Sequence, residues 1–343
     1  MHLNKILKIQ EPERYQMMIK SPIFYLVGLL LTLNMFGCQS ITQKSGSSDR
    51  GKTATPINRQ CFSTSPTNQR TKRTVFMLAA GANVGELTET SNDVKNFSEI
   101  IQQHFKIPKN QICKLNNAFK AELENALYSL KQHLINNDLV IIYFSGHGSH
   151  IPDDNGDEED GWDETLVTYD VKGETEPEAT DVLRDDRLTA LVNALPTDRV
   201  LTVMDTCFSS GMYLGKNQPN ALLAKARSKF FIKGEIGTQA PHFQAHKNRI
   251  IKNKKGNFDT LKGLLLAAAS EEEKALEIPT QGIFFITTGG GLFTLKFVQQ
   301  LKKQGNIKQA FIQARQIVQE TSQTNQSKQT PQAIGKWEVL EGN

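Results

Sequence analysis

Two side chains with complementary chemistry follow two of the most apolar segments of the sequence. His147 follows the run at 139–144 (LVIIYF), and Cys207 follows the run at 200–204 (VLTVM). A thiol is only slightly ionised at neutral pH, and a neighbouring imidazole can take its proton or stabilise its anion. The same imidazole can later protonate a leaving amine. The two residues therefore predict a nucleophilic thiol–imidazole dyad.

Each residue alone has a simpler interpretation. A cysteine at the end of a buried strand is commonly inert packing, and a histidine in a glycine-rich loop is commonly a loop residue. The pair favours chemistry, because the carboxyl ends of parallel strands meet at one edge of a sheet. Glycines on both sides of His147 allow a tight turn. The amides of Gly148 and Cys207 are candidate oxyanion donors, each contributing about 3–4 kcal/mol in comparable sites.

The elements that must position this pair alternate between strands and helices. Continuous apolar runs predict buried strands, and apolar residues at helical spacing predict helices. The predicted strands are 75–80, 112–115, 139–144, 166–169, 200–204 and 264–269, and the predicted helices are 92–105, 121–134, 186–195, 293–303 and 307–321. This order predicts a three-layer α/β/α sandwich with a mostly parallel sheet.

Composition divides the chain into five segments. Residues 1–38 form a targeting segment, 39–72 a flexible polar tether, 73–220 a larger part carrying the dyad, 221–261 a linker, and 262–343 a smaller C-terminal part. The linker carries nine basic residues and few acidic ones, which predicts an exposed basic segment.

The N-terminal segment predicts export and membrane association. An apolar stretch at 21–36 follows Lys20 and ends before Gly37-Cys38. This pattern is typical of a lipoprotein signal with Cys38 as the lipidated residue, of a single uncleaved anchor, or of a cleaved signal peptide. With 38% hydrophobic and 22% charged residues, the rest of the chain excludes a multi-span membrane protein. A net charge of +4, without basic runs interleaved with aromatics, argues against nucleic acid as a partner.

Two further cysteines, Cys61 and Cys113, have two interpretations. In an exported protein they can form a disulfide. They can equally be two unpaired residues of the core.

Residues 73–343 resemble the caspase-like cysteine peptidases, most closely the metacaspases and their prokaryotic relatives. The resemblance is carried, in family order, by TVFMLAAGAN (74–83), SND (91–93), VIIYFSGHGS (140–149), DEEDGWDETLVTYD (157–170), RDDRL (184–188), VLTVMDTCFSSG (200–211), AASEEEKALE (268–277), and PQ (331–332) with Gly335. It implies the caspase-hemoglobinase fold and hydrolysis of polypeptides through a His147/Cys207 dyad. The QAC signature of true caspases is absent.

The resemblance also implies the pocket for the residue before the cleaved bond. Asp205, Asp93 and Ser145 match its lining positions. Two carboxylates favour Arg or Lys through charge pairing. The simpler interpretations are a strand-end turn residue for Asp205 and a helix N-cap for Asp93.

Calcium is the one metal that the sequence suggests, as an activator rather than a requirement of the chemistry. Residues 153–164 carry eight acidic side chains in twelve positions, which suits Ca²⁺ or simply a solvated loop. In the resembling family, Asp163, Asp185 and Asp186 match three ligand positions, and Leu214 replaces the fourth. Near the nucleophile, Phe208 replaces a common histidine, and Ser209-Ser210-Gly211 replaces Ser-Gly; the thiol, base and pocket acids remain.

Four alternatives compete with or extend this prediction. The chain can be a catalytically silent caspase-like binding module tethered to a membrane, an Asp-specific peptidase, or a thiol acyltransferase. The presence of both His147 and Cys207 disfavours the first, and the acidic pocket disfavours the second. If the pocket takes Arg or Lys, the basic segment at 225–255 is a site for self-cleavage; its simpler interpretation is a solvated loop.

Overall fold

The computed structural model describes residues 61–62, 70–153, 156, 162–171, 182–207, 225–231, 260–270, 273–280, 289–323 and 327–342. The predicted targeting segment with Cys38, most of the tether, Leu214 and most of the basic linker lie outside these residues. Among the residues described, no helix is both long and apolar enough to cross a bilayer.

A six-stranded sheet with the order β12-β9-β7-β3-β1-β2 forms the centre of the fold. Its first five strands along the chain are parallel neighbours, and only β12 runs antiparallel, beside β9. The strands are β1 (Val75–Gly81), β2 (Ile112–Asn116), β3 (Leu139–Ser145), β7 (Val200–Asp205), β9 (Leu264–Ala267) and β12 (Gln332–Gly335). The predicted mostly parallel sheet is confirmed.

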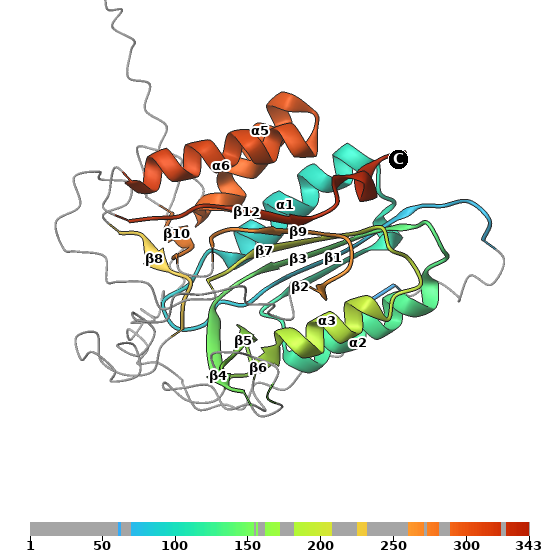
Figure 1. Cartoon of the computed structure of the whole chain (residues 1–343), viewed down its shortest axis with the longest axis horizontal. Coiled ribbons are helices and arrows are strands. Elements are labelled where there is room, and N and C mark those ends of the chain that lie inside the picture. The colour runs from blue at the N-terminus through green and yellow to red at the C-terminus, as the bar shows by residue number, and fades with distance from the viewer. Residues whose placement is uncertain are drawn as a thin grey trace, which may run out of the picture. The chain divides into compact units, whose positions relative to one another are not determined.

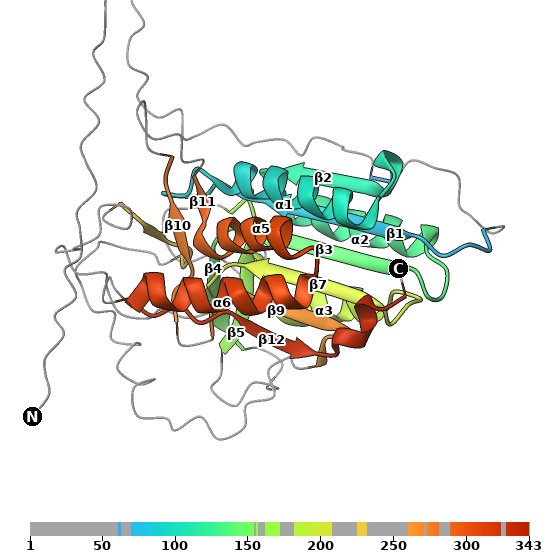
Figure 2. The ribbon, with the colours of Figure 1, turned by 90° about the horizontal axis from the view of Figure 1, so that it is seen from above.

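Helices cover both faces of this sheet (Figures 1 and 2). One face carries α1 (Thr90–Phe105), α5 (Leu292–Gln304) and α6 (Ile307–Gln323), and the other carries α2 (Lys120–His133) and α3 (Asp185–Asn193). Two short 3₁₀ helices, η1 (Lys109–Gln111) and η3 (Trp337–Leu340), complete the helical elements described. The three-layer α/β/α sandwich expected from the sequence is therefore present.

Two separate cores explain why the central strands are apolar throughout. Along β3, Tyr143 packs into the core under α1 and α5, while its neighbour Phe144 packs into the core over α2 and α3. Successive side chains of a strand point to opposite faces, so a strand covered on both faces has no polar alternation.

Two smaller sheets lie at the same end of the large sheet, beyond the carboxyl ends of β3 and β7 (Figures 1 and 2). One has the order β11-β10-β8 and the other β4-β5-β6. Their strands are β4 (Gly148–Pro152), β5 (Trp162–Val167), β6 (Val182–Arg184), β8 (Arg227–Ser228), β10 (Leu276–Ile278) and β11 (Gly290–Gly291). Only β5 was predicted, and it begins and ends earlier than the expected 166–169.

The packed domain begins upstream of the predicted boundary at residue 73. Cys61 forms a disulfide with Cys113 on β2, and Phe62 packs edge-on against Phe76, with ring centroids 5.8 Å apart. Arg70 forms an ion pair with the buried carboxylate of Asp138. The sequence allowed Cys61 and Cys113 to be either a disulfide or two unpaired core residues, and the structure shows the disulfide.

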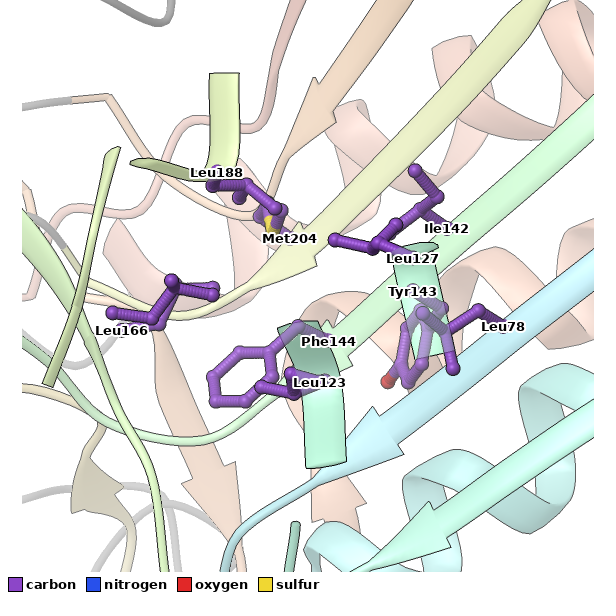
Figure 3. A pocket seen from close by; sticks show the side chains of 10 residues that line it. Leu78, Leu123, Leu127, Ile142, Tyr143, Phe144, Leu166, Leu188 and Met204 are labelled. Carbon is purple, nitrogen blue, oxygen red and sulfur yellow. The ribbon is translucent and has the colours of Figure 1, made fainter. Parts of the chain in front are cut away.

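The core over α2 and α3 contains a small cavity of about 10 Å³ (Figure 3). It is lined by Leu78, Leu123, Leu127, Ile142, Tyr143, Phe144, Leu166, Leu183, Leu188 and Met204. It has room for about one water molecule and an almost wholly apolar lining, so it is a packing defect and not a substrate site.

Candidate active site

The predicted dyad residues leave adjacent strands of the sheet. β3 and β7 pair in register, with Ser145 opposite Asp205, and His147 and Cys207 each follow two residues later. The two loops touch at Gly148: a Cβ there would lie 1.7 Å from the carbonyl oxygen of Cys207. Any side chain at 148 would therefore push the two loops apart.

The imidazole of His147 is buried and held in one orientation. Its Nε2 lies 3.1 Å from the carbonyl oxygen of Val84. Because a carbonyl only accepts hydrogen bonds, Nε2 carries the proton, and Nδ1 is the basic nitrogen of the neutral ring. Nδ1 has no hydrogen-bond partner among the described residues. Burial lowers the pKa of His147 to about 4, so the ring is neutral at neutral pH and is a weaker base here than an exposed imidazole.

The thiol of Cys207 is fully buried. Its Sγ accepts a hydrogen bond from the amide of Ala275 at 2.8 Å and lies 3.2 Å from the carbonyl oxygen of the same residue. Burial raises the pKa of Cys207 to about 12. In this state of the molecule the nucleophile is therefore a protonated, covered thiol.

The three predicted pocket residues lie together and enclose a lysine. Asp93, Ser145 and Asp205 are all fully buried, and so is Lys229. The Lys229 ammonium lies 3.1 Å from Asp93 Oδ2, 2.8 Å from Ser145 Oγ, and 3.1 Å from both Oδ1 and the backbone oxygen of Asp205. An ammonium carries three donors, and this pocket satisfies them with charged and neutral oxygens.

Neighbouring elements fix the two carboxylates. Asp93 lies in the first turn of α1, whose N-cap is Glu89, and accepts hydrogen bonds from Ser145 Oγ and the amide of Gly291. Asp205 Oδ2 accepts from the amide and the hydroxyl of Thr294, at 3.1 and 2.5 Å. A Cβ at Gly291 would lie 2.1 Å from Asp205 Oδ2, so a glycine is needed at the pocket wall.

The pocket holds two carboxylates against one ammonium. Burial raises the pKa of Asp93, and Lys229 only partly opposes that rise. Burial alone would lower the pKa of Lys229, but the carboxylates of Asp205 and Asp93 outweigh it and raise the pKa. The lysine is therefore charged, and the pocket is suited to a cation.

The backbone around Lys229 is bound in the same region. The amide of Lys229 donates to the carbonyl of Ala275 at 3.0 Å, and the carbonyl of Lys229 accepts from the amide of Gly148 at 2.9 Å. Two residues on, the amide of Phe231 donates to the carbonyl of Gly148 at 2.9 Å. The expectation of an exposed basic linker is therefore wrong for residues 226–231, because burial of Lys229 in an acidic pocket anchors this segment, whereas Lys225 is exposed as expected.

Asp163, Asp185 and Asp186, the three residues suggested as calcium ligands, lie on β5 and at the start of α3. Asp163 is buried and forms an ion pair with Arg184, with 2.7 Å between the charged atoms. Within the described ranges no three acidic, histidine or cysteine side chains group closely enough to hold a metal. Most of the acidic loop at 153–164 lies outside the described residues, and calcium binding stays a prediction from the sequence.

Several residues at this site were not singled out from the sequence, and Lys229 and Ala275 are the two that contact the predicted pocket and nucleophile most directly. Lys229 was one of nine basic residues of the linker, with no local signal to distinguish it. Ala275 lies in the AASEEEKALE segment, which the sequence analysis quoted without assigning a role to any of its residues.

Comparisons with known proteins identify the family of the chain. The family model described as the caspase domain matches residues 76–336. Metacaspase-1A of Aspergillus oryzae is 31% identical over 134 residues, which cover 36% of this chain and 31% of the relative. Metacaspase-1 of Coccidioides immitis is 30% identical over 134 residues, covering 36% of this chain and 28% of the relative. The chain thus matches about a third of the length of these curated relatives.

Solved structures show distant likenesses. A protein from Geobacter sulfurreducens is 21% identical, with a TM-score of 0.49, over 77% of this chain and 94% of that one. Caspase-1 from Spodoptera frugiperda is 12% identical, with a TM-score of 0.42, over 83% of this chain and 94% of that one.

Proposed function

Because the chain belongs to the caspase-domain peptidase family, we propose that it is a cysteine endopeptidase that cleaves polypeptides after Lys or Arg. The observation that carries this proposal is the position of Lys229. Its ammonium lies between Asp93 and Asp205, and its carbonyl oxygen accepts the Gly148 amide. A substrate residue that precedes a cleaved bond needs both contacts. The carboxylates recognise its side chain, and the amide stabilises the oxyanion that develops on its carbonyl oxygen.

The proposed reaction uses only groups of this chain and water. His147 Nδ1 takes the proton of the Cys207 thiol, and the sulfur attacks the carbonyl carbon of the substrate. The amide of Gly148 stabilises the resulting oxyanion, and a second donor from the Cys207 amide is part of the proposal. The intermediate breaks its C–N bond, and the leaving amine takes the proton from His147. Water then gives a proton to His147 and attacks the thioester carbonyl. The C–S bond breaks, the sulfur takes the proton from His147 to become the thiol again, and the new carboxylic acid loses its proton to solvent.

The chain itself supplies the first substrate under this proposal. The bound segment presents the bond between Lys229 and Phe230 to the nucleophile, and the Lys229 backbone influences the pKa of both His147 and Cys207. The self-cleavage expected somewhere in 225–255 is therefore assigned to this bond. The buried thiol belongs to the uncut state, and release of the segment would open the pocket to other polypeptides.

Self-cleavage is tested on the purified full chain by mass spectrometry of the products. We expect a fragment beginning at Phe230 that is absent from Cys207→Ala and from Lys229→Ala. Lys225→Ala is the matched control, since Lys225 is a basic residue of the same segment but is exposed, and it should cleave normally. An intact wild-type chain after prolonged incubation at high concentration would contradict this assignment.

Specificity in trans is tested with three fluorogenic peptides that differ only in a final Arg, Lys or Asp. We expect hydrolysis after Arg and Lys, none after Asp, and none by Cys207→Ala. Cleavage after Asp alone would reject the pocket assignment. Absence of both self-cleavage and peptide hydrolysis would favour the silent binding module, and thioester formation without hydrolysis would favour an acyltransferase.

We also propose that the chain is exported and held at a membrane by its N-terminal segment, as a lipoprotein or by a single anchor. The Cys61–Cys113 disulfide supports export, because such bonds persist in oxidising compartments. Fractionation of cells producing the full chain tests this: we expect it in the membrane fraction, and Cys38→Ala should release it if lipidation is the anchor.

A further inference from the structure

The bound segment presents a second basic side chain to the protein. Arg227 lies two residues before Lys229, and β8 pairs with β10 so that Arg227 is opposite Glu277. Alternate residues of an extended chain point to the same face. Arg227 and Lys229 therefore share one face of the segment, and the intervening Ser228 points the other way.

The guanidinium of Arg227 has two partners. Its Nη1 lies 3.2 Å from Glu277 Oε1 and donates to the hydroxyl of Thr88 at 2.7 Å. The side chain of Glu277 is fully buried, whereas that of Arg227 is 28% exposed. The contact therefore joins a partly solvated guanidinium to a buried carboxylate.

Glu277 is held in place independently of Arg227. Its two carboxylate oxygens accept the amides of Thr88 and Glu89, each at 3.1 Å. A carboxylate that is fixed by the backbone before a ligand arrives loses little side-chain entropy on binding. This is the arrangement expected of a specificity subsite rather than of an incidental surface ion pair.

We propose that Glu277 and Thr88 form a second substrate subsite, which selects a basic residue at the third position before the cleaved bond, two residues before the Lys or Arg at which the chain is cut. This inference rests on the proposed function and narrows its substrate class to polypeptides with the pattern Arg-X-Lys or Arg-X-Arg. The middle position is not selected by this subsite, because its side chain, Ser228, points away from both acidic groups and hydrogen-bonds with the Cys207 thiol. An acidic residue at the first position of this pattern meets Glu277 and is rejected by charge repulsion.

Binding to a full chain that cannot turn over separates recognition from catalysis. A triple variant, Cys207→Ala with Arg227→Ala and Lys229→Ala, lacks the nucleophile and both basic side chains that hold residues 225–231 in the site. The probe is a dye-labelled peptide of residues 226–231 (ARSKFF), read by fluorescence anisotropy, beside versions with Ala or Glu in place of its Arg. A fourth peptide, with Ala in place of its Lys, reports the first pocket.

We expect the Arg peptide to bind about tenfold more tightly than the Ala peptide, the gain typical of a partly solvated charged hydrogen bond. The Glu peptide should bind more weakly still. Adding Glu277→Gln should remove the preference for Arg. Because Glu277 is buried and could be needed for folding, Thr88→Val is the second variant. Thr88 is exposed, and its loss should reduce the preference without affecting the Ala peptide.

Equal binding of the Arg and Ala peptides, with binding still dependent on the Lys, would overturn the second subsite and leave the proposed function standing. A preference for Arg that survives both Glu277→Gln and Thr88→Val would also overturn it. Absence of binding by every peptide would reject both the subsite and the Lys pocket.

Discussion

At the scale of single residues, the reactivity of Cys207 depends on whether residues 225–231 cover the site. The pKa of Cys207 is raised to about 12 by burial, compared with about 8.5 for a free thiol. At pH 8 only about one thiol in ten thousand would be ionised in the covered state. Thiol reactivity therefore reports directly on whether residues 225–231 are in place.

Alkylation of Cys207 by iodoacetamide should be slow in His147→Gln, which cannot turn over and keeps the segment bound. Adding Lys229→Ala should speed alkylation by at least about 100-fold at pH 8, because an uncovered thiol ionises near its ordinary pKa. The rate is measured by mass spectrometry of the modified peptide over a range of pH. Equal rates in the two variants would mean that the segment does not cover the thiol.

The lowered pKa of His147 predicts a pH-dependent stability. The folded pKa is about 4 and the ordinary value is 6.5. Between these values the unfolded chain binds a proton that the folded chain does not. Folded stability should therefore fall as the pH drops from 6.5 to 4, by at most about 3 kcal/mol.

Urea unfolding of Cys207→Ala at pH 4.5 and 7 measures this effect, and Cys207→Ala with His147→Gln is the control. The raised pKa of Asp93 acts in the opposite direction over the same range, and it is present in both variants. The difference between them therefore isolates His147. A loss of stability of the same size in both variants would contradict the prediction.

At the scale of elements, the very short strand β11 completes a pocket whose polar residues come from α1, β3 and β7. β11 contributes Gly291, whose amide binds Asp93 and whose missing side chain leaves room for the ammonium of Lys229. Gly291→Ala would place a Cβ 2.5 Å from that ammonium. We expect kcat/KM for Lys and Arg peptides to fall by at least about 100-fold, as displacements near 1 Å can cause.

Circular dichroism and thermal unfolding are the controls for Gly291→Ala, since the fold should persist while the pocket is blocked. Self-cleavage after Lys229 should be lost together with peptide hydrolysis. Unchanged hydrolysis after Lys would show that the ammonium of a substrate does not enter between Asp93 and Asp205.

The contrast between long and short elements explains what the sequence could predict. The runs that became β3 and β7 are buried on both faces, so their apolar composition alone reveals them, and they deliver His147 and Cys207 to one edge. By contrast, β8 has two residues, β10 has three, and neither shows a periodicity. Their pairing depends on long-range contacts, so neither Lys229, which follows β8, nor Glu277 on β10 could be distinguished from the other charged residues of 225–255 and 268–277.

At the scale of the whole molecule, one covalent bond ties the upstream chain to the folded domain. Cys61 and Cys113 lie 52 residues apart in the sequence, and Cys113 lies on the edge strand β2. The backbone oxygen of Cys61 also accepts the hydroxyl of Ser129, from α2. Cys61 is therefore held at the β2 edge of the domain.

Closing a loop of 52 residues should stabilise the domain by up to about 4 kcal/mol, because it restricts the unfolded chain. Urea unfolding should therefore show a loss approaching that value in Cys61→Ala with Cys113→Ala, and a similar loss when the parent chain is reduced. Cys207→Ala in all samples prevents self-cleavage and leaves this pair as the redox-active cysteines of the folded domain. Reduction should have no effect on the double variant. The prediction fails if reduction destabilises both proteins equally. It also fails if the double substitution and reduction of the parent chain each lower the free energy of unfolding by less than about 1 kcal/mol. Either result would mean that the bond does not stabilise the domain, and would withdraw the structural support for export to an oxidising compartment.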